Sequence, residues 1–222
     1  MSTPIVRHLI LKDLYLLRWM AIGTIAGGLV AAAVMSLSAN PINGGGVLMI
    51  CALIILNIFV VMTGIVAERK ERVSLFVMTL PVSRRQYVAA KVAANALAFF
   101  VPWTVLTLAV LAAITWSPIP DGYLPFWMAL LGFILLDYCV LLAIGLNTDS
   151  TGWHAAAITV GNVSVNFFIM LLFSLPSVRS VGDGQPAGWT PDLVALTVGE
   201  IVLGLLVLGV AVVVRARRPD FM

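Results

Sequence analysis

The sequence predicts an all-α integral membrane protein with six transmembrane helices, on three observations. The 222-residue chain is 61% hydrophobic and only 10% charged, with a mean hydropathy of +1.07, whereas soluble domains are about 45–50% apolar and about 25% charged. It contains six apolar runs long enough to cross a bilayer, which takes about 20 residues. Its basic residues gather on one side of those runs. This composition excludes a soluble enzyme, a nucleic-acid-binding domain and a disordered chain.

The six runs follow one another without a long linker or an internal repeat. The predicted spans are Met20–Leu37, Val47–Ala67, Val88–Ile114, Phe126–Leu146, Trp153–Phe173 and Leu193–Val214. Turn-forming residues separate them, as in Asn40–Gly45, Ser117–Gly122 and Gly182–Pro186. Residues 1–222 are therefore expected to form a single domain.

The orientation follows from the basic residues, which are enriched on the cytoplasmic side of membrane proteins. With six crossings, twelve of the 13 Lys and Arg residues share one side, and only Arg179 falls opposite. The shared set comprises Arg7, Lys12 and Arg18 before the first span, Arg69, Lys70, Arg72, Arg84, Arg85 and Lys91 between the second and third, and Arg215, Arg217 and Arg218 after the last. Both termini are predicted to be cytoplasmic.

The segment before the first span, Ile5–Arg18, has helical periodicity of its own. Arg7, His8, Lys12 and Arg18 share one sector of the helical wheel and apolar residues fill the other, with Asp13 the exception. The pattern predicts an interfacial elbow helix, which serves either as a basic anchor or as a contact for a cytoplasmic partner. A cleaved signal peptide is the alternative, since small residues follow the first span.

The second cytoplasmic connection carries a charged cluster, residues 68–72, followed by a helix-length apolar piece that Pro81 ends. One face of this piece has i, i+3, i+4, i+7 spacing and is expected to rest on the bundle. It comprises Val73, Phe76, Val77 and Leu80. The opposite face comprises Ser74, Leu75, Met78 and Thr79, with Glu71 and Arg72 at its rim. The segment is either a docking helix with two faces or a simple interfacial connection.

Four candidate residues for a substrate pathway lie within the predicted spans. Asp137 is near the middle of the fourth span, where a carboxylate costs on the order of 2.5–3.5 kcal/mol, and Glu200 is in the outer half of the sixth, where the cost is lower. Asn162 and Asn166 are one turn apart on the fifth, after Thr159, and this stripe is expected to face other helices. These residues are candidates for a substrate pathway, and interhelical hydrogen bonds are the alternative.

No catalytic, metal or nucleotide site is predicted in this chain. The two histidines, His8 and His154, are too far apart for a His-Glu-x-x-His zinc motif, and no lysine follows a glycine as in a Walker A loop. Cys51 and Cys139 lie in apolar runs and are expected to be small buried side chains. An intramembrane enzyme is therefore disfavoured, whereas a proton-coupled secondary transporter that uses Asp137 and Glu200 remains an alternative.

One string of residues resembles a known family. Leu80-Pro81-Val82-Ser83-Arg84, with Lys91 ten residues after the proline and Glu68 thirteen before it, is similar to the signature of ABC-2 type transporter permeases. Leu11-Lys12-Asp13-Leu14 is similar to the family's opening segment. Many members have a Gly-Thr pair where this chain has Arg72 and Val73. This variant resembles the small permeases of bacterial peptide and bacteriocin exporters.

The resemblance implies an exporter subunit in the bacterial inner membrane that pairs with a second permease, a homodimer being expected. Two cytoplasmic ATPase subunits would bind ATP and Mg, and no cofactor would bind this chain. The cargo would be a hydrophobic peptide, a lipid or a drug, and a haem-exporter-type permease is the nearest alternative. The helix before Pro81 would act as a coupling helix, with the ATPase contacts Glu68, Glu71, Arg72, Ser74, Leu75, Met78 and Thr79.

Overall fold

The computed structural model of the protein describes all residues except 1–2, 41, 68–83, 149, 183–188 and 218–222. The described residues are helical and contain no β-strand. The elements are α1 (Thr3–Met35), α2 (Gly44–Val61), the π-helix η1 (Met62–Ala67), α5 (Arg84–Thr115), the 3₁₀ turn η2 (Asp121–Tyr123), α6 (Leu124–Asn147), α7 (Thr151–Ser174), α8 (Pro176–Gly182) and α9 (Pro191–Arg217).

Six of these helical segments are long and apolar enough to cross a membrane, which confirms the predicted all-α architecture. They are Val6–Met35, Gly44–Ala67, Gln86–Thr115, Asp121–Asn147, Thr151–Ser174 and Pro191–Arg215. Each overlaps one predicted span over most of its length. The short helix α8 and the π-helix η1 were not predicted, because both depend on local backbone geometry rather than on an apolar period.

The N-terminal segment differs from the prediction of a separate elbow helix. Helix α1 runs without a break through 33 residues, so Ile5–Arg18 is its first half. At 1.5 Å per residue α1 is about 50 Å long, and a bilayer core is about 30 Å thick, so part of it extends beyond the hydrocarbon. The prediction of a separate element was wrong because no residue in this stretch breaks a helix, and because Asp13 faces the bundle.

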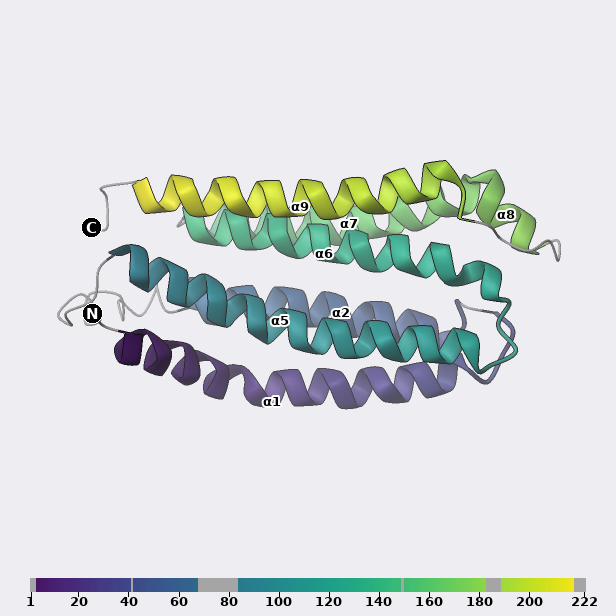
Figure 1. Ribbon diagram of the computed structural model, residues 1–222, viewed down its shortest axis with the longest axis horizontal. Coiled ribbons are helices and arrows are strands. Elements are labelled where there is room, and N and C mark those ends of the chain that lie inside the picture. The colour runs from purple at the N-terminus through teal and green to yellow at the C-terminus, as the bar shows by residue number, and fades with distance from the viewer. Residues whose placement is uncertain (1–2, 41, 68–83, 149, 183–188, 218–222) are drawn as a thin grey trace.

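The helices form two groups of three (Figure 1). Helix α1 packs on α2 and α5 in one group, and α6 packs on α7 and α9 in the other. The groups meet where α6 contacts α2 and α5 and where α5 contacts α9. The beginning of α1, the beginning of α5 and the end of α9 lie at the same end of the bundle (Figure 1).

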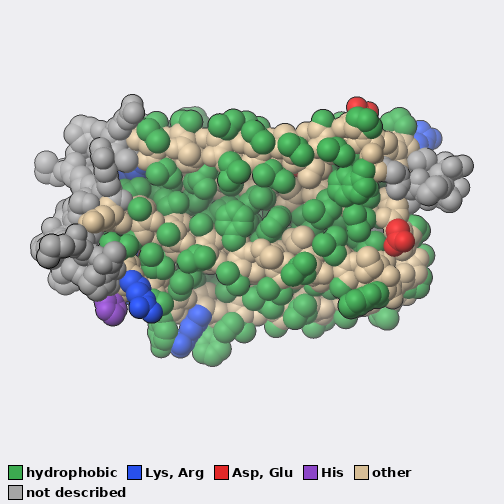
Figure 2. All heavy atoms as spheres, viewed as in Figure 1, with side chains coloured by type: hydrophobic (Ala, Val, Ile, Leu, Met, Phe, Trp, Pro, Cys, Tyr) green, Lys and Arg blue, Asp and Glu red, His purple; other side chains and the backbone are tan. Residues whose placement is uncertain are grey.

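The core is centred on α6. Trp127, Leu130, Tyr138 and Leu142 of this helix are fully buried, and the Tyr138 ring stacks on Phe99 of α5 with centroids 3.9 Å apart. The outer sides of α1, α7 and α9 instead carry many exposed apolar side chains. Figure 2 shows hydrophobic side chains along the length of one face of the bundle, with charged residues near its ends. Such an apolar belt is what a bilayer requires of the surface that it contacts.

The predicted turn at Asn40–Gly45 connects α1 to α2. Asn43 caps α2 by accepting hydrogen bonds from the backbone amides of Gly45 and Gly46, and it donates to the carbonyl oxygen of Met35 at 2.9 Å. Gly45 contacts the α1 backbone so closely that a Cβ at this position would collide with it. The glycine therefore allows α1 and α2 to form a tight hairpin.

The two cysteines are free and differ in their surroundings. Cys139 is buried in α6, as expected, but Cys51 is exposed on α2. The prediction for Cys51 was wrong because an apolar run in a membrane protein does not distinguish the side that faces lipid from the side that faces the core.

Candidate functional site

The predicted coupling helix lies outside the described residues. Glu68, Glu71, Arg72, Ser74, Leu75, Met78 and Thr79 all belong to the range 68–83. The structure describes the elements on both sides of this range: η1 ends at Ala67 and α5 begins at Arg84. Three buried polar contacts join α5 to other helices: one to α1, one to α2 and one to α6.

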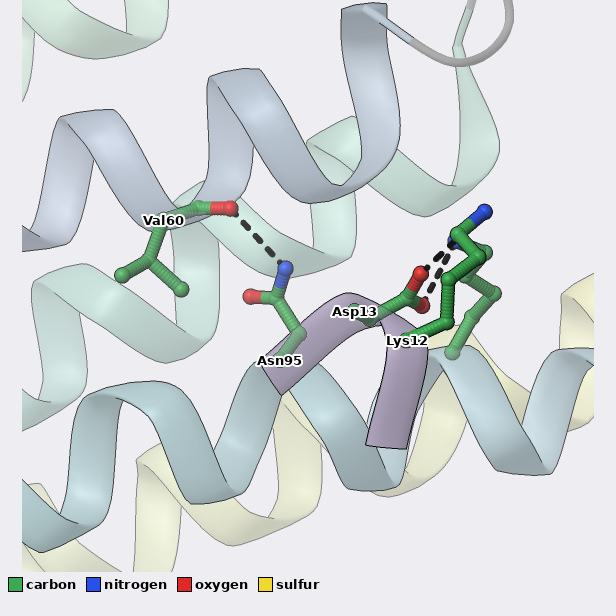
Figure 3. A network of polar contacts seen from close by, with 5 residues as sticks. Lys12, Asp13, Val60 and Asn95 are labelled. Carbon is green, nitrogen blue, oxygen red and sulfur yellow. Dashed lines mark hydrogen bonds and ion pairs between the residues drawn. The ribbon is translucent and has the colours of Figure 1, made fainter. Parts of the chain in front are cut away.

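The first contact is a buried ion pair between α1 and α5. Lys91 Nζ donates to Asp13 Oδ2 at 2.7 Å, and both side chains are less than 10% exposed. Lys12 Nζ lies 3.5 Å from Asp13 Oδ1, but its side chain is 50% exposed (Figure 3). The two residues of the pair come from the two segments that resemble the family, Leu11–Leu14 and the stretch ending at Lys91. The sequence signal was Asp13, the one charge outside the cationic sector.

The second contact joins α5 to the end of α2, two residues before the π-helix η1 begins. Asn95 Nδ2 donates to the carbonyl oxygen of Val60 at 3.0 Å (Figure 3). A Cβ on Gly64 would overlap this amide, so the glycine is what admits it. A π-helix shifts the backbone bonding from i→i+4 to i→i+5, which leaves a carbonyl in need of a donor. The Asn95 side chain supplies a donor at the point where α2 changes into η1, the element that leads to the connection 68–83.

The same amide links the two groups of helices. Tyr138 Oη of α6 donates to Asn95 Oδ1 at 3.3 Å, and the interaction is buried. One residue earlier, Asp137 Oδ2 accepts a hydrogen bond from Asn57 Nδ2 of α2 at 2.7 Å. Two adjacent residues of α6 therefore bond to α5 and to α2, and these bonds place polar chemistry at the junction of the two groups.

Asp137 is partly exposed and lies against α7. A Cβ on Gly161 would overlap Asp137 Oδ1, so this glycine leaves room for the carboxylate. The interhelical hydrogen bond that the sequence offered as one alternative is present. Since the other alternative, contact with a substrate, needs access, the partial exposure of Asp137 keeps it a candidate for the pathway.

Glu200 has a different environment. It is 6% exposed in α9 and packs against Gly132 of α6, where a Cβ would lie 2.8 Å from Oε2. Neither carboxylate oxygen has a hydrogen-bond partner in the described part of the chain. Glu200 is therefore enclosed in the α6–α9 interface, apart from Asp137, which faces α2 and α7.

The polar stripe on α7 does not face the other helices of the chain, which corrects the prediction. Thr159 and Asn166 are exposed, and Asn162 is partly exposed. The amide of Asn162 donates to the carbonyl oxygen of Ile158, and that of Asn166 donates to Asn162. The three residues do share one side of the helix, as their spacing predicts. The sequence does not show which side of α7 packs against the bundle.

The cationic residues at the start of α1 lie on its exposed side. Arg7 and Lys12 are exposed, and Arg18 is partly exposed with its guanidinium 3.7 Å from the Tyr15 ring centroid. Arg18 also lies 5.1 Å from the ring of Trp19. These residues were predicted to line an elbow helix, and the structure places them on the first half of α1 instead.

Comparison with known proteins adds one finding. Residues 8–215 match the family model described as ABC-2 family transporter protein. No curated protein and no solved structure matches the chain.

Proposed function

The chain belongs to the ABC-2 transporter family, and on that premise we propose that it is the permease subunit of an ATP-driven exporter. The family match over residues 8–215 carries the proposal, because it includes all six transmembrane helices. The permease forms the pathway, and separate cytoplasmic ATPase subunits bind ATP and Mg²⁺. A Walker A loop binds the phosphates of ATP and contains a Gly-Lys step. None of the lysines in this sequence follows a glycine, so the proposal assigns ATP binding to a separate subunit.

The connection 68–83 is the proposed docking site for the ATPase. It leaves η1 and enters α5 at the end of the bundle where α1 begins and α9 ends. The three basic clusters also fall on this side, which supports a cytoplasmic location. Contact through Ser74, Leu75, Met78 and Thr79 leaves the other face of the segment for the bundle.

Docking is tested by co-purification with a candidate ATPase subunit that is co-expressed with this chain. Met78→Asp would bury an unpaired carboxylate in the contact and should abolish co-purification. Arg72→Ala, at the rim, should change the affinity by about 1 kcal/mol or less. Retained binding and hydrolysis by a correctly inserted Met78→Asp protein would exclude this docking face. Transport by the chain alone, driven by a proton gradient, would favour the secondary transporter.

The exposed polar stripe of α7 supports pairing with a second copy. Thr159 and Asn166 lie well inside a transmembrane helix and point away from its own bundle. Lipid tails offer such groups no hydrogen bonds, whereas polar side chains stabilise helix–helix contacts by about 0.6–2 kcal/mol. A homodimer that joins the α7 helices would bring the two stripes together.

Cysteine cross-linking tests this dimer. In a background without Cys51 and Cys139, Thr159→Cys should form a cross-linked dimer in the membrane. Val210→Cys is the matched control, because it is exposed on α9 at a similar distance from the cytoplasmic helix end. Cross-linking at Val210 but not at Thr159 would place the dimer contact on α9.

The proposed pathway uses Asp137 with the stripe on α7. Asp137 is partly exposed near the middle of α6, and Asn162 is partly exposed on the adjacent helix. Apolar side chains make up most of the surrounding surface, which suits a hydrophobic peptide, a lipid or a drug. Asp137→Asn should preserve assembly with the ATPase and reduce substrate-stimulated ATP hydrolysis. Unchanged stimulation would remove Asp137 from the pathway.

The topology of the proposal has its own test. In intact cells, an impermeant thiol reagent should label Ser180→Cys, on the predicted outer side, and should not label Ser83→Cys. Labelling of Ser83→Cys alone would reverse the orientation and would place the docking segment outside the cell.

A further inference from the structure

The exposed side of the first half of α1 carries a continuous set of cationic and aromatic side chains. This cationic face comprises Arg7, His8, Lys12, Tyr15, Arg18 and Trp19. The opposite side of the same turns, with Asp13 and Leu17, is buried against the bundle. Asp13 is the only acidic residue before Gly44, and it pairs with Lys91. Asp13 Oδ1 also lies 3.5 Å from Lys12 Nζ, and the carboxylate itself is buried on the opposite side of the helix.

Arg18 has a defined geometry on this face. Its guanidinium lies 3.7 Å from the Tyr15 ring centroid and 5.1 Å from that of Trp19. Helical side chains lean toward the N-terminus, so the Arg18 side chain extends over Tyr15 toward the N-terminal end of α1. Its Nε is buried and has no hydrogen-bond partner among the described residues. The two rings thus hold the guanidinium in place, and its Nε donates to no group in the described part of the chain.

Along the helix, the exposed side chains change from charged to aromatic to apolar, in the same order as the headgroup, interfacial and acyl-chain regions of a membrane leaflet. Charged residues occupy positions 7–12, Tyr15 and Trp19 follow at 64% and 70% exposure, and exposed apolar residues such as Ile22 and Leu29 continue from there. Tyrosine and tryptophan are enriched at the headgroup level of membranes, and chains of lipid begin just below it. Arg18, between the two aromatic residues, is therefore at the level of the lipid phosphates.

We propose that this face binds the phosphate of an anionic phospholipid from the cytoplasmic leaflet, with Arg18 as its direct ligand. Arginine suits a phosphate because its planar fork donates two parallel hydrogen bonds. Tyr15 and Trp19 orient the guanidinium, and Arg7 and Lys12 attract the headgroup. The proposal rests on the orientation of the chain in the membrane and does not depend on transport or on an ATPase.

The test measures lipid preference at the protein surface. The purified protein is reconstituted in phosphatidylcholine vesicles, and the fraction of immobilised lipid is compared for spin-labelled phosphatidylglycerol and spin-labelled phosphatidylcholine. Wild-type protein should prefer phosphatidylglycerol about fivefold, the ratio that corresponds to an attraction of about 1 kcal/mol between one basic side chain and an anionic headgroup. Arg18→Gln should lose most of this preference while its circular dichroism spectrum stays unchanged.

Two matched variants separate a site from diffuse attraction. Arg7→Gln removes the same charge from the same face but leaves Arg18 between its aromatic residues, and it should reduce the preference less than Arg18→Gln does. Arg179→Gln, on α8 at the other end of the bundle, should leave it unchanged. Equal losses for Arg7→Gln and Arg18→Gln, or no preference in the wild type, would overturn the proposal.

A soluble anion distinguishes the lipid from free phosphate. Inorganic phosphate at millimolar concentration should not displace the spin-labelled phosphatidylglycerol, because it lacks the acyl chains that the apolar side of α1 contacts. Displacement by inorganic phosphate would identify a site for soluble anions and would overturn the assignment to a lipid.

Discussion

Each group of three helices buries a carboxylate, but the hydrogen-bonding environment of the carboxylate differs between the two groups. In the group of α1, α2 and α5, Asp13 is enclosed but bonds to Lys91 at 2.7 Å. In the group of α6, α7 and α9, Glu200 is equally enclosed, yet neither of its oxygens has a partner among the described residues. Lys91 belongs to α5, which follows the connection 68–83, whereas Glu200 lies in the first half of α9.

The difference shows where this fold depends on directional contacts. A buried ion pair adds little to net stability, but removal of one partner leaves the other charge uncompensated. The Asp13–Lys91 pair and the Asn95–Val60 bond therefore fix α5 against α1 and α2 at the end where we propose that the ATPase docks. The α6–α9 interface depends instead on close packing, as at Gly132 and Gly204.

The largest expected effect comes from breaking the ion pair. Asp13→Ala should lower the free energy of unfolding by about 3–5 kcal/mol, because it removes the carboxylate that lies 2.7 Å from the buried Lys91 ammonium. Unfolding by a denaturing detergent, followed by circular dichroism, measures the change. Lys12→Gln is the control, since its side chain is 50% exposed, and should cost about 1 kcal/mol or less. Equal costs for both variants would mean that the pair does not hold α1 to α5.

A smaller effect is expected where α5 meets the π-helix. Gly64→Ala would place a Cβ on the amide of Asn95 and displace it from Val60, at a cost of about 1–3 kcal/mol. Gly23→Ala is the matched control in a transmembrane helix, because its Cβ would meet no atom within 4 Å. That variant should be neutral or slightly stabilising. The same detergent assay would contradict this reading if Gly64→Ala were the milder change.

The contact between the two groups should be weaker again. Asn57→Leu removes the donor to Asp137 and should cost about 0.6–2 kcal/mol, the range of hydrogen bonds between transmembrane helices. Combining Asn57→Leu with Asp137→Leu should recover part of the loss, since no carboxylate is then left without its donor. An additive double variant would show that the two residues do not interact.

The smallest effect, and one of opposite sign, is expected at Glu200. Glu200→Met keeps the volume and removes a buried carboxylate that has no hydrogen-bond partner among the residues the structure describes, so the stability should stay constant or increase. A thermal unfolding scan in detergent measures it, with Glu200→Ala as the control that leaves a cavity and should destabilise. A clear loss of stability in Glu200→Met would reveal a partner for this carboxylate, such as a residue of a second subunit.

Most of the fold could be predicted from the sequence, and the candidate site only in part. The six spans were found because crossing a bilayer demands about 20 apolar residues, a signal that needs no neighbours. The bond of Asp137 was anticipated as one alternative, since a carboxylate inside a membrane needs a partner. Its hydrogen-bond partner Asn57 was not predicted, because the position of an asparagine within an apolar run does not indicate which neighbouring helix its side chain contacts.

The sequence by itself determined the number of crossings, the side on which the basic residues gather and the lack of a Walker A loop, because each depends on composition or on spacing along the chain. Only the tertiary structure decided which helix faces are covered. It paired Asp13 with Lys91 across 78 positions, enclosed Glu200 and left the stripe of Thr159 and Asn166 exposed. In a membrane protein the packed side and the lipid side of a helix are both apolar, so hydrophobic periodicity cannot separate them.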